Sequence, residues 1–235
     1  MTQPLRYVDP SFPNHVCRLW KSLYGLKQAP HAWFDRFSTQ LLHMGFHASL
    51  ANSSLFIYRE NNYLLYLLVH VDDIVLTGNS PSFLNILIQQ LRHAFELKDL
   101  GPLHYFLDLH ITRISRRFYL NQSKYAQDLL QKHNMLSSQV NRTPCAPNLR
   151  LVPNEGHFLA NPHEYRNLDG SLHYLTFTRP DLSFAVHQVC QFTVVPTNAH
   201  LGAIKCFLRY LNGNPTSGIF LQSGPLSLFA FSDLD

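Results

Sequence analysis

Two adjacent aspartates, Asp72 and Asp73, directly follow the longest apolar stretch of the chain, Tyr63 to Val71. A second apolar run, residues 74–76, comes directly after them. Such a density of Leu, Val and Tyr is typical of a buried strand. Two neighbouring carboxylates in a buried strand would repel each other and lose solvation. Either a tight turn therefore exposes both side chains, or a divalent cation lies between them.

Composition limits the class of protein. The 235 residues are 46% hydrophobic, which is enough for one or two cores. The net charge of +4 suits an anionic partner such as nucleic acid, although Lys and Arg form no dense block. The four cysteines have no paired spacing, which is typical of reduced thiols in an intracellular protein, cytoplasmic or nuclear. No run is long enough to span a bilayer, so no membrane partner is expected; the oligomeric state stays open.

Periodicity and turn residues predict an α+β fold, with an antiparallel sheet and helices on one of its faces. Helices are expected over about 30–44, 80–95, 123–132, 163–176, 181–193 and 197–211. Strands are expected over 55–58, 63–71, 74–77, 105–114, 117–121, 218–221 and 226–231. Residues 1–30 should be irregular, and the proline-containing residues 141–162 should form a connector.

Several motifs occur in order along nearly the whole chain. They are Ser22–Trp33 (SLYGLKQAPHAW), His70–Asp73 (HVDD), Leu97–Gly101 with Tyr105–Leu107 (LKDLG and YFL), Leu120–Ala126 and Leu175–Leu182. The first resembles the SLYGLKQAPRAW signature of copia-type retrotransposon reverse transcriptases, and the second resembles their YVDD box. This resemblance implies RNA-directed DNA synthesis with Mg²⁺, deoxynucleotides and an RNA or DNA primer–template.

The resemblance also implies roles for individual residues. Asp72 would be the stronger metal ligand, with Asp73 nearby or at the primer end. As a bare dipeptide, however, the pair would more often be a solvated turn. By the same resemblance His70 stands in the nucleotide or template site.

The SLYGLKQAP segment would supply further nucleotide or template contacts. Tyr24 would lie beside the sugar, Gly25 would allow close backbone approach, and Lys27 would offset phosphate charge, with Gln28 next to it. Lys98 could donate a proton to pyrophosphate. The alternatives are an ordinary loop before a helix and a surface lysine.

Three departures from the family pattern stand out. His70 replaces Tyr, and Asp108 replaces Gly. No strand carries the upstream metal-binding aspartate of the family, and Asp9, in a loop flanked by proline, is a poor substitute. We therefore expect the chain alone to be catalytically inactive, because one carboxylate arm cannot hold two ions.

The expected domains are a partial polymerase palm (1–140), a connector with a helical thumb-like region (141–215), and the truncated start of a ribonuclease H-like domain (216–235). Asp233 would be the first metal-binding aspartate of that last domain, with a frayed terminus as the alternative.

Two weaker pairs can be read as packing. His43 and His47 lie four apart on an expected helix, a zinc-binding spacing, but we expect a surface or half-buried pair. His187 and Cys190 are also expected to pack rather than ligate. Besides a polymerase fragment, a non-catalytic nucleic-acid-binding remnant and a decayed reading frame without a stable fold remain open.

Overall fold

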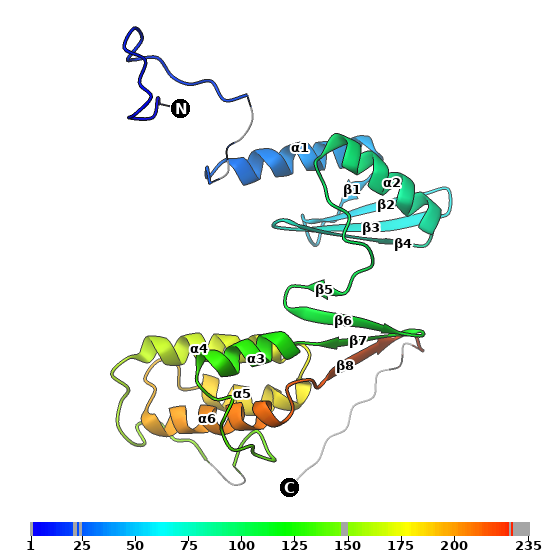
Figure 1. Ribbon diagram of the computed structural model, residues 1–235. Helices are drawn as coiled ribbons and strands as arrows, with labels where there is room; N and C mark the ends of the chain where they lie inside the picture. Colours follow the sequence, from blue (N-terminus) through cyan, green and yellow to red (C-terminus); the bar gives the residue numbers. More distant parts are fainter. Residues whose placement is uncertain (1, 21–22, 24, 147–149, 226, 228–235) are drawn as a thin grey trace. The chain divides into compact units, whose positions relative to one another are not determined.

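The computed structural model describes residues 2–20, 23, 25–146, 150–225 and 227. The chain divides into two compact units, Met1–Leu100 and Gly101–Asp235 (Figure 1). Each unit contains helices and a four-stranded antiparallel sheet, which confirms the α+β class. None of the described helices is both long and apolar enough to cross a membrane.

The N-terminal unit is a sheet with helices on one face (Figure 1). Its described elements are α1 (Ala29–His43), β1 (His47–Ala48), β2 (Leu55–Glu60), β3 (Tyr63–His70), β4 (Asp73–Gly78) and α2 (Pro81–Ala94). The strand order is β1-β2-β3-β4, and every neighbouring pair is antiparallel. Apart from an isolated bridge between Thr2 and Val16, the described residues before α1 are irregular, as expected.

Local sequence explains the boundaries of these elements. Asn61 and Asn62 adopt positive φ angles of 48° and 64° in the turn between β2 and β3, a conformation that Asn tolerates better than most residues. Gly45, with φ of 87°, follows the end of α1. The Ser80 hydroxyl accepts a bond from the Phe83 amide and caps α2, which starts with Pro81.

The apolar strand β3 is covered on one face only. Leu65, Leu67 and Val69 are buried in the core with side chains from α1 and α2. Tyr66 and His70, whose side chains alternate to the other face, are exposed, and Tyr66 keeps 39% of its surface accessible. The expectation of a fully buried strand was therefore wrong, because an antiparallel sheet with helices on one face buries only alternate residues.

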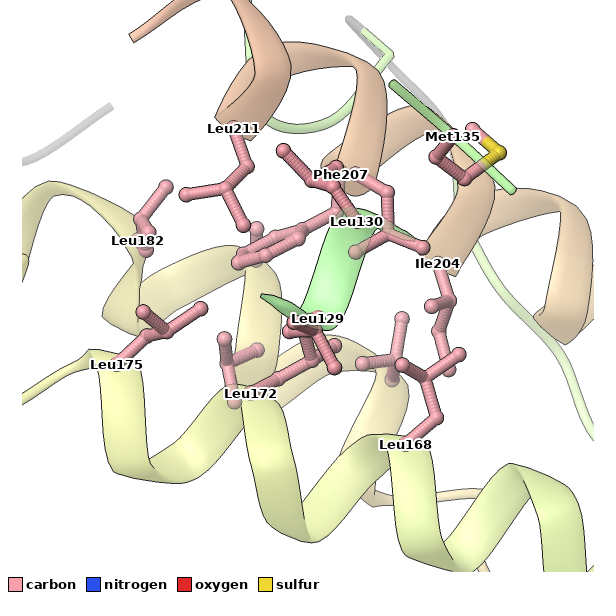
Figure 2. Close-up of a cluster of buried hydrophobic side chains, with 14 of the residues drawn as sticks. Leu129, Leu130, Met135, Leu168, Leu172, Leu175, Leu182, Ile204, Phe207 and Leu211 are labelled. Carbon is pink, nitrogen blue, oxygen red and sulfur yellow. The ribbon is translucent and has the colours of Figure 1, made fainter. Parts of the chain in front are cut away.

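The C-terminal unit combines a second sheet with a helical core. Its described elements are β5 (Tyr105–Phe106), β6 (Leu109–Ile114), β7 (Arg117–Asn121), α3 (Ser123–Lys132), α4 (Pro162–Leu175), a 3₁₀ turn (Pro180–Leu182), α5 (Ser183–Cys190), α6 (Asn198–Gly213) and β8 (Gly218–Gln222). Leucines of α3 and α4 pack with Ile204, Phe207 and Leu211 of α6 to form the core (Figure 2).

This unit differs from the sequence expectation in two elements. The strand expected over 105–114 breaks at Leu107 and Asp108, whose φ angles are 47° and 58°. The helix expected over 181–193 is a 3₁₀ turn followed by α5, which ends at Cys190. The last described strand, β8, pairs with β7, whereas a hairpin with residues 226–231 was expected. Its expected partner, 226–231, lies outside the described residues except for Ser227, and the domain boundaries expected from the sequence stay predictions.

An ion pair in the C-terminal unit stabilises the segment between α4 and α5. Arg179 is 2% exposed, and its guanidinium donates to both carboxylate oxygens of Asp181, at 2.9 and 2.8 Å. It also donates to the Asn214 carbonyl, at 2.6 Å, and so joins this segment to the end of α6. The hydrogen bonds from Arg179 are the main reason that the pKa of Asp181 is lowered.

We predict that Asp181→Asn destabilises the chain at neutral pH by about 1–2 kcal/mol, because it leaves the buried Arg179 without its counter-charge. The folded-state pKa of Asp181 lies below its unfolded value, so its contribution is complete above the unfolded pKa and is lost as pH falls through the folded pKa. The difference between wild type and variant should therefore shrink below about pH 4. Urea unfolding followed by circular dichroism at several pH values measures it.

Asp128→Asn is the matched control, since it removes an equal charge from an exposed position of the same unit. Its effect should stay within about 0.5 kcal/mol. Equal stability losses in the two variants would contradict a specific role for the Arg179–Asp181 pair.

Candidate functional site

The Asp72–Asp73 pair lies at a two-residue hairpin turn. The register between β3 and β4 pairs His70 with Asp73, and Val71 and Asp72 form the turn between them. Both aspartates are exposed. The structure therefore confirms the turn and explains how the two carboxylates avoid the desolvation that a buried strand would impose.

Asp73 and His70 point to the sheet face that α1 and α2 leave open. Side chains alternate along β3, and Leu65, Leu67 and Val69 occupy the face in the core. His70 is therefore on the opposite face, and Asp73, which is directly across from it, shares that face. The imidazole thus stands beside one carboxylate of the pair.

The backbone of the turn is strained at Val71. Its φ angle of 51° lies in the left-handed region, which β-branched residues rarely adopt. The Val71 side chain is 77% exposed, so little burial offsets this cost. Strain of this kind, about 1–3 kcal/mol, tends to occur at functional sites.

The SLYGLKQAP segment precedes α1. Gly25 has a φ angle of 88°, which side chains rarely adopt without strain, and no atom lies within 4 Å of the position that a Cβ would occupy. Lys27 and Gln28 are exposed, and Gln28 is the N-cap of α1 without a side-chain cap bond. Tyr24 lies outside the described residues. The backbone conformation thus accounts for glycine at position 25, whereas the nucleotide contacts expected of this segment stay predictions.

The remaining candidates are not brought to the turn by any described contact. Lys98 is exposed in the irregular segment after α2. Within the described ranges, no hydrogen bond or ion pair joins Lys27, Gln28 or Lys98 to Asp72 or Asp73. The side chain of Asp9 accepts a bond from the Ser11 amide, at 2.8 Å, within its own loop. Asp233 lies outside the part of the chain that the structure describes.

The Asp72–Asp73 turn and a second cluster differ in how many potential metal ligands they bring together. Among the described residues, no third His, Cys, Asp or Glu joins Asp72 and Asp73 to make a group of three potential ligands. Such a group does form in the C-terminal unit, from Asp169, His173 and Cys190. Sequence reasoning missed it, although Asp169 and His173 are four residues apart on α4, which was a usable signal.

The histidine pairs are only partly as expected. His43 ends α1, but His47 lies on β1, because Gly45 stops the helix between them. The expectation that both lie on one helix was therefore wrong, while both are exposed as predicted. His187 is exposed and is not part of the group that contains Cys190.

The family departure at Asp108 has a conformational explanation. Asp108 is in the β5–β6 turn with a positive φ angle, where Gly is the least strained residue and Asp is tolerated. Its carboxylate accepts a bond from the Tyr105 hydroxyl, at 2.7 Å, and this bond is the main cause that raises the pKa of Tyr105 to about 12. The substitution therefore keeps the turn and adds a side-chain contact across it.

Comparison with known proteins decides the family. The model of the family described as reverse transcriptase (RNA-dependent DNA polymerase) matches residues 1–147, well over half of the chain. The chain belongs to this family. Its similarity to copia-type retrotransposon polyproteins extends over the whole chain.

Three relatives illustrate this similarity. The retrovirus-related Pol polyprotein from transposon RE1 of Arabidopsis thaliana is 46% identical over the whole chain, which covers 16% of that polyprotein. The Pol polyprotein from transposon TNT 1-94 of Nicotiana tabacum is 33% identical over the whole chain, which covers 18% of it. An uncharacterized mitochondrial protein of Arabidopsis thaliana is 41% identical over 73% of the chain and 71% of that protein. No solved structure matches this reverse transcriptase chain significantly.

We predict that Val71→Gly stabilises the chain by about 1 kcal/mol, because glycine adopts a positive φ angle without strain. Val71→Ala is the control, since alanine keeps a Cβ and most of the strain, and it should gain less than half of that. Thermal unfolding of the three proteins measures the difference. A lower melting temperature for the glycine variant would show that the turn stores no strain at Val71.

Proposed function

We propose that this chain supplies the metal-binding turn of an RNA-directed DNA polymerase. The observation that carries the proposal is the exposed Asp72–Asp73 pair at the β3–β4 turn, within the region that the family model matches. In this proposal the sheet β1–β4 with α1 and α2 is palm, and the helices of the C-terminal unit are thumb or connection. Residues 216–235 would begin a ribonuclease H-like domain.

The donor set at the turn fits Mg²⁺. Carboxylate oxygens are the hard ligands that Mg²⁺ prefers, and a site with few protein ligands leaves positions for water and phosphate oxygens. Asp72 would be the principal ligand and Asp73 the second. When bound, the metal supplies charge stabilisation for phosphoryl transfer from a deoxynucleotide.

The residues of the chain would do the positioning. Asp73 and His70 share the open sheet face, so a primer end placed on that face would meet the carboxylate and the imidazole together. Gly25 presents bare backbone in a left-handed conformation, which a nucleotide can approach closely. Lys27 and Lys98 are exposed cations that would offset phosphate charge.

The chain alone should not polymerise. Two carboxylates at one turn supply one arm of a two-metal site, and no third ligand joins them among the described residues. The missing ligand should reduce the stabilisation of the transition state by about 3 kcal/mol or more.

The decisive experiment replaces the corresponding segment of the RE1 Pol polyprotein with these 235 residues. We predict Mg²⁺-dependent primer extension by the chimera, and none by the isolated chain. Asp72→Asn should lower extension by the chimera about 100-fold or more, because it removes the principal metal ligand.

Asp35→Asn is the matched control, since it removes an equal charge from an exposed position on α1. It should leave extension by the chimera unchanged. Full activity of the Asp72→Asn chimera would overturn the proposed role of the turn, and incorporation by the isolated chain would overturn its predicted inactivity.

A second candidate is nucleic-acid binding without catalysis. The excess of 19 basic over 15 acidic residues favours it, as does the lack of a third ligand at the described turn. In that case the isolated chain binds a primer–template duplex with an affinity that falls steeply with salt. Asp72→Asn would then leave binding unchanged or slightly tighter.

A further inference from the structure

The cluster of Asp169, His173 and Cys190 joins two helices of the C-terminal unit. On α4, Tyr165, Asp169 and His173 follow one another at four-residue steps and therefore form one stripe. The Tyr165 hydroxyl donates to the Val189 carbonyl, at 2.7 Å, and so holds the end of α5 against this stripe. Cys190, the last residue of α5, is thereby placed beside Asp169 and His173.

The three side chains converge on a common point. Cys190 Sγ lies 2.6 Å from Asp169 Oδ1 and 2.8 Å from His173 Nε2. All three candidate ligand atoms lie within 4.8 Å of one another. In a nucleophile–base–acid relay the carboxylate would orient the imidazole, whereas here the carboxylate and the imidazole both contact the sulfur. The three side chains are therefore close enough together to serve as ligands of one ion.

Asp169 is a buried carboxylate that a nearby cation would stabilise. Asp169 is 7% exposed, and Leu168 and Leu172 of the same helix belong to the apolar core. An ionised carboxylate in such surroundings is costly unless it is paired. The thiol of Cys190 is a weak donor and supplies no charge, whereas a bound cation would supply it.

We propose that Asp169, His173 and Cys190 bind a divalent transition-metal ion, of which zinc fits best. Zinc takes thiolate, imidazole and carboxylate ligands together. His173 is exposed, so the ion has access from solvent, and a water molecule would complete a tetrahedral site. The soft sulfur ligand disfavours Mg²⁺, so this site is chemically different from the Asp72–Asp73 turn.

Binding of the ion would remove the proton from the Cys190 thiol. In the metal-free chain, burial and, second, the bond to Asp169 raise the pKa of the Cys190 thiol to about 12. The ion binds the thiolate, so one proton leaves Cys190 for solvent for each ion bound. The ion links the end of α5 to α4 and should therefore stabilise the unit.

The test is metal binding by the full chain. The purified protein is stripped with chelator, and zinc is titrated by calorimetry and quantified by elemental analysis. We expect one zinc per chain and a rise in melting temperature. Cobalt bound in place of zinc should show a thiolate-to-metal charge-transfer band, which reports the cysteine ligand directly.

Variants assign the ligands. Asp169→Asn keeps the side-chain shape and an oxygen that can accept the Cys190 bond, so it should fold as wild type does. It should nevertheless weaken zinc binding about 100-fold or more. Cys190→Ser should abolish the charge-transfer band, and His173→Gln should weaken binding in the same way. Magnesium should not compete with zinc or cobalt at this site.

Cys145→Ser and His187→Gln are matched controls, because each removes a potential ligand of the same unit outside the cluster. Both should bind zinc as wild type does. Binding lost equally in a control would overturn the assignment. Wild-type protein that binds no more zinc than the Asp169→Asn variant would overturn the site itself, and this comparison holds even if Cys190→Ser does not fold.

Discussion

The register of β3 against β4 determines where the two aspartates are presented. Pairing of Val69 with Ile74 and of His70 with Asp73 leaves only Val71 and Asp72 to reverse the chain. A shift by one residue would either move Leu65 and Leu67 out of the core or turn Asp73 toward it. The burial of alternate β3 side chains under α1 and α2 therefore fixes the carboxylates at an exposed tip. Val71, in the turn itself, adopts a φ angle of 51°.

Positive φ angles explain how the chain departs from its family without losing its turns. Asp108 replaces a glycine of the family pattern, and it adopts a φ angle of 58° that glycine would adopt freely. The bond from Tyr105, together with that from Tyr174 to the Leu107 carbonyl, helps to hold this turn. Asn61 and Asn62 likewise adopt positive φ angles in the turn between β2 and β3. Short polar side chains therefore hold conformations that glycine adopts most freely.

The two carboxylate sites of this reverse transcriptase chain differ in solvation. Asp72 and Asp73 are solvated at a turn, where hard oxygen ligands and water suit Mg²⁺. Asp169 is buried between helices and lies beside sulfur and imidazole, which suit zinc. The first arrangement follows from a hairpin, and the second from the packing of α4 on α5.

The sequence alone determined most of the local elements, the α+β class, the Asp72–Asp73 turn and the family. Helical periodicity, the Asn61–Asn62 turn and proline positions act over a few residues, so they can be read directly. The sequence could not show that β8 pairs with β7, about a hundred residues earlier, or that β3 buries one face only. Nor could it bring Cys190 to Asp169 and His173. Those features depend on which surfaces pack together, and only tertiary structure decides the packing of residues far apart in the chain.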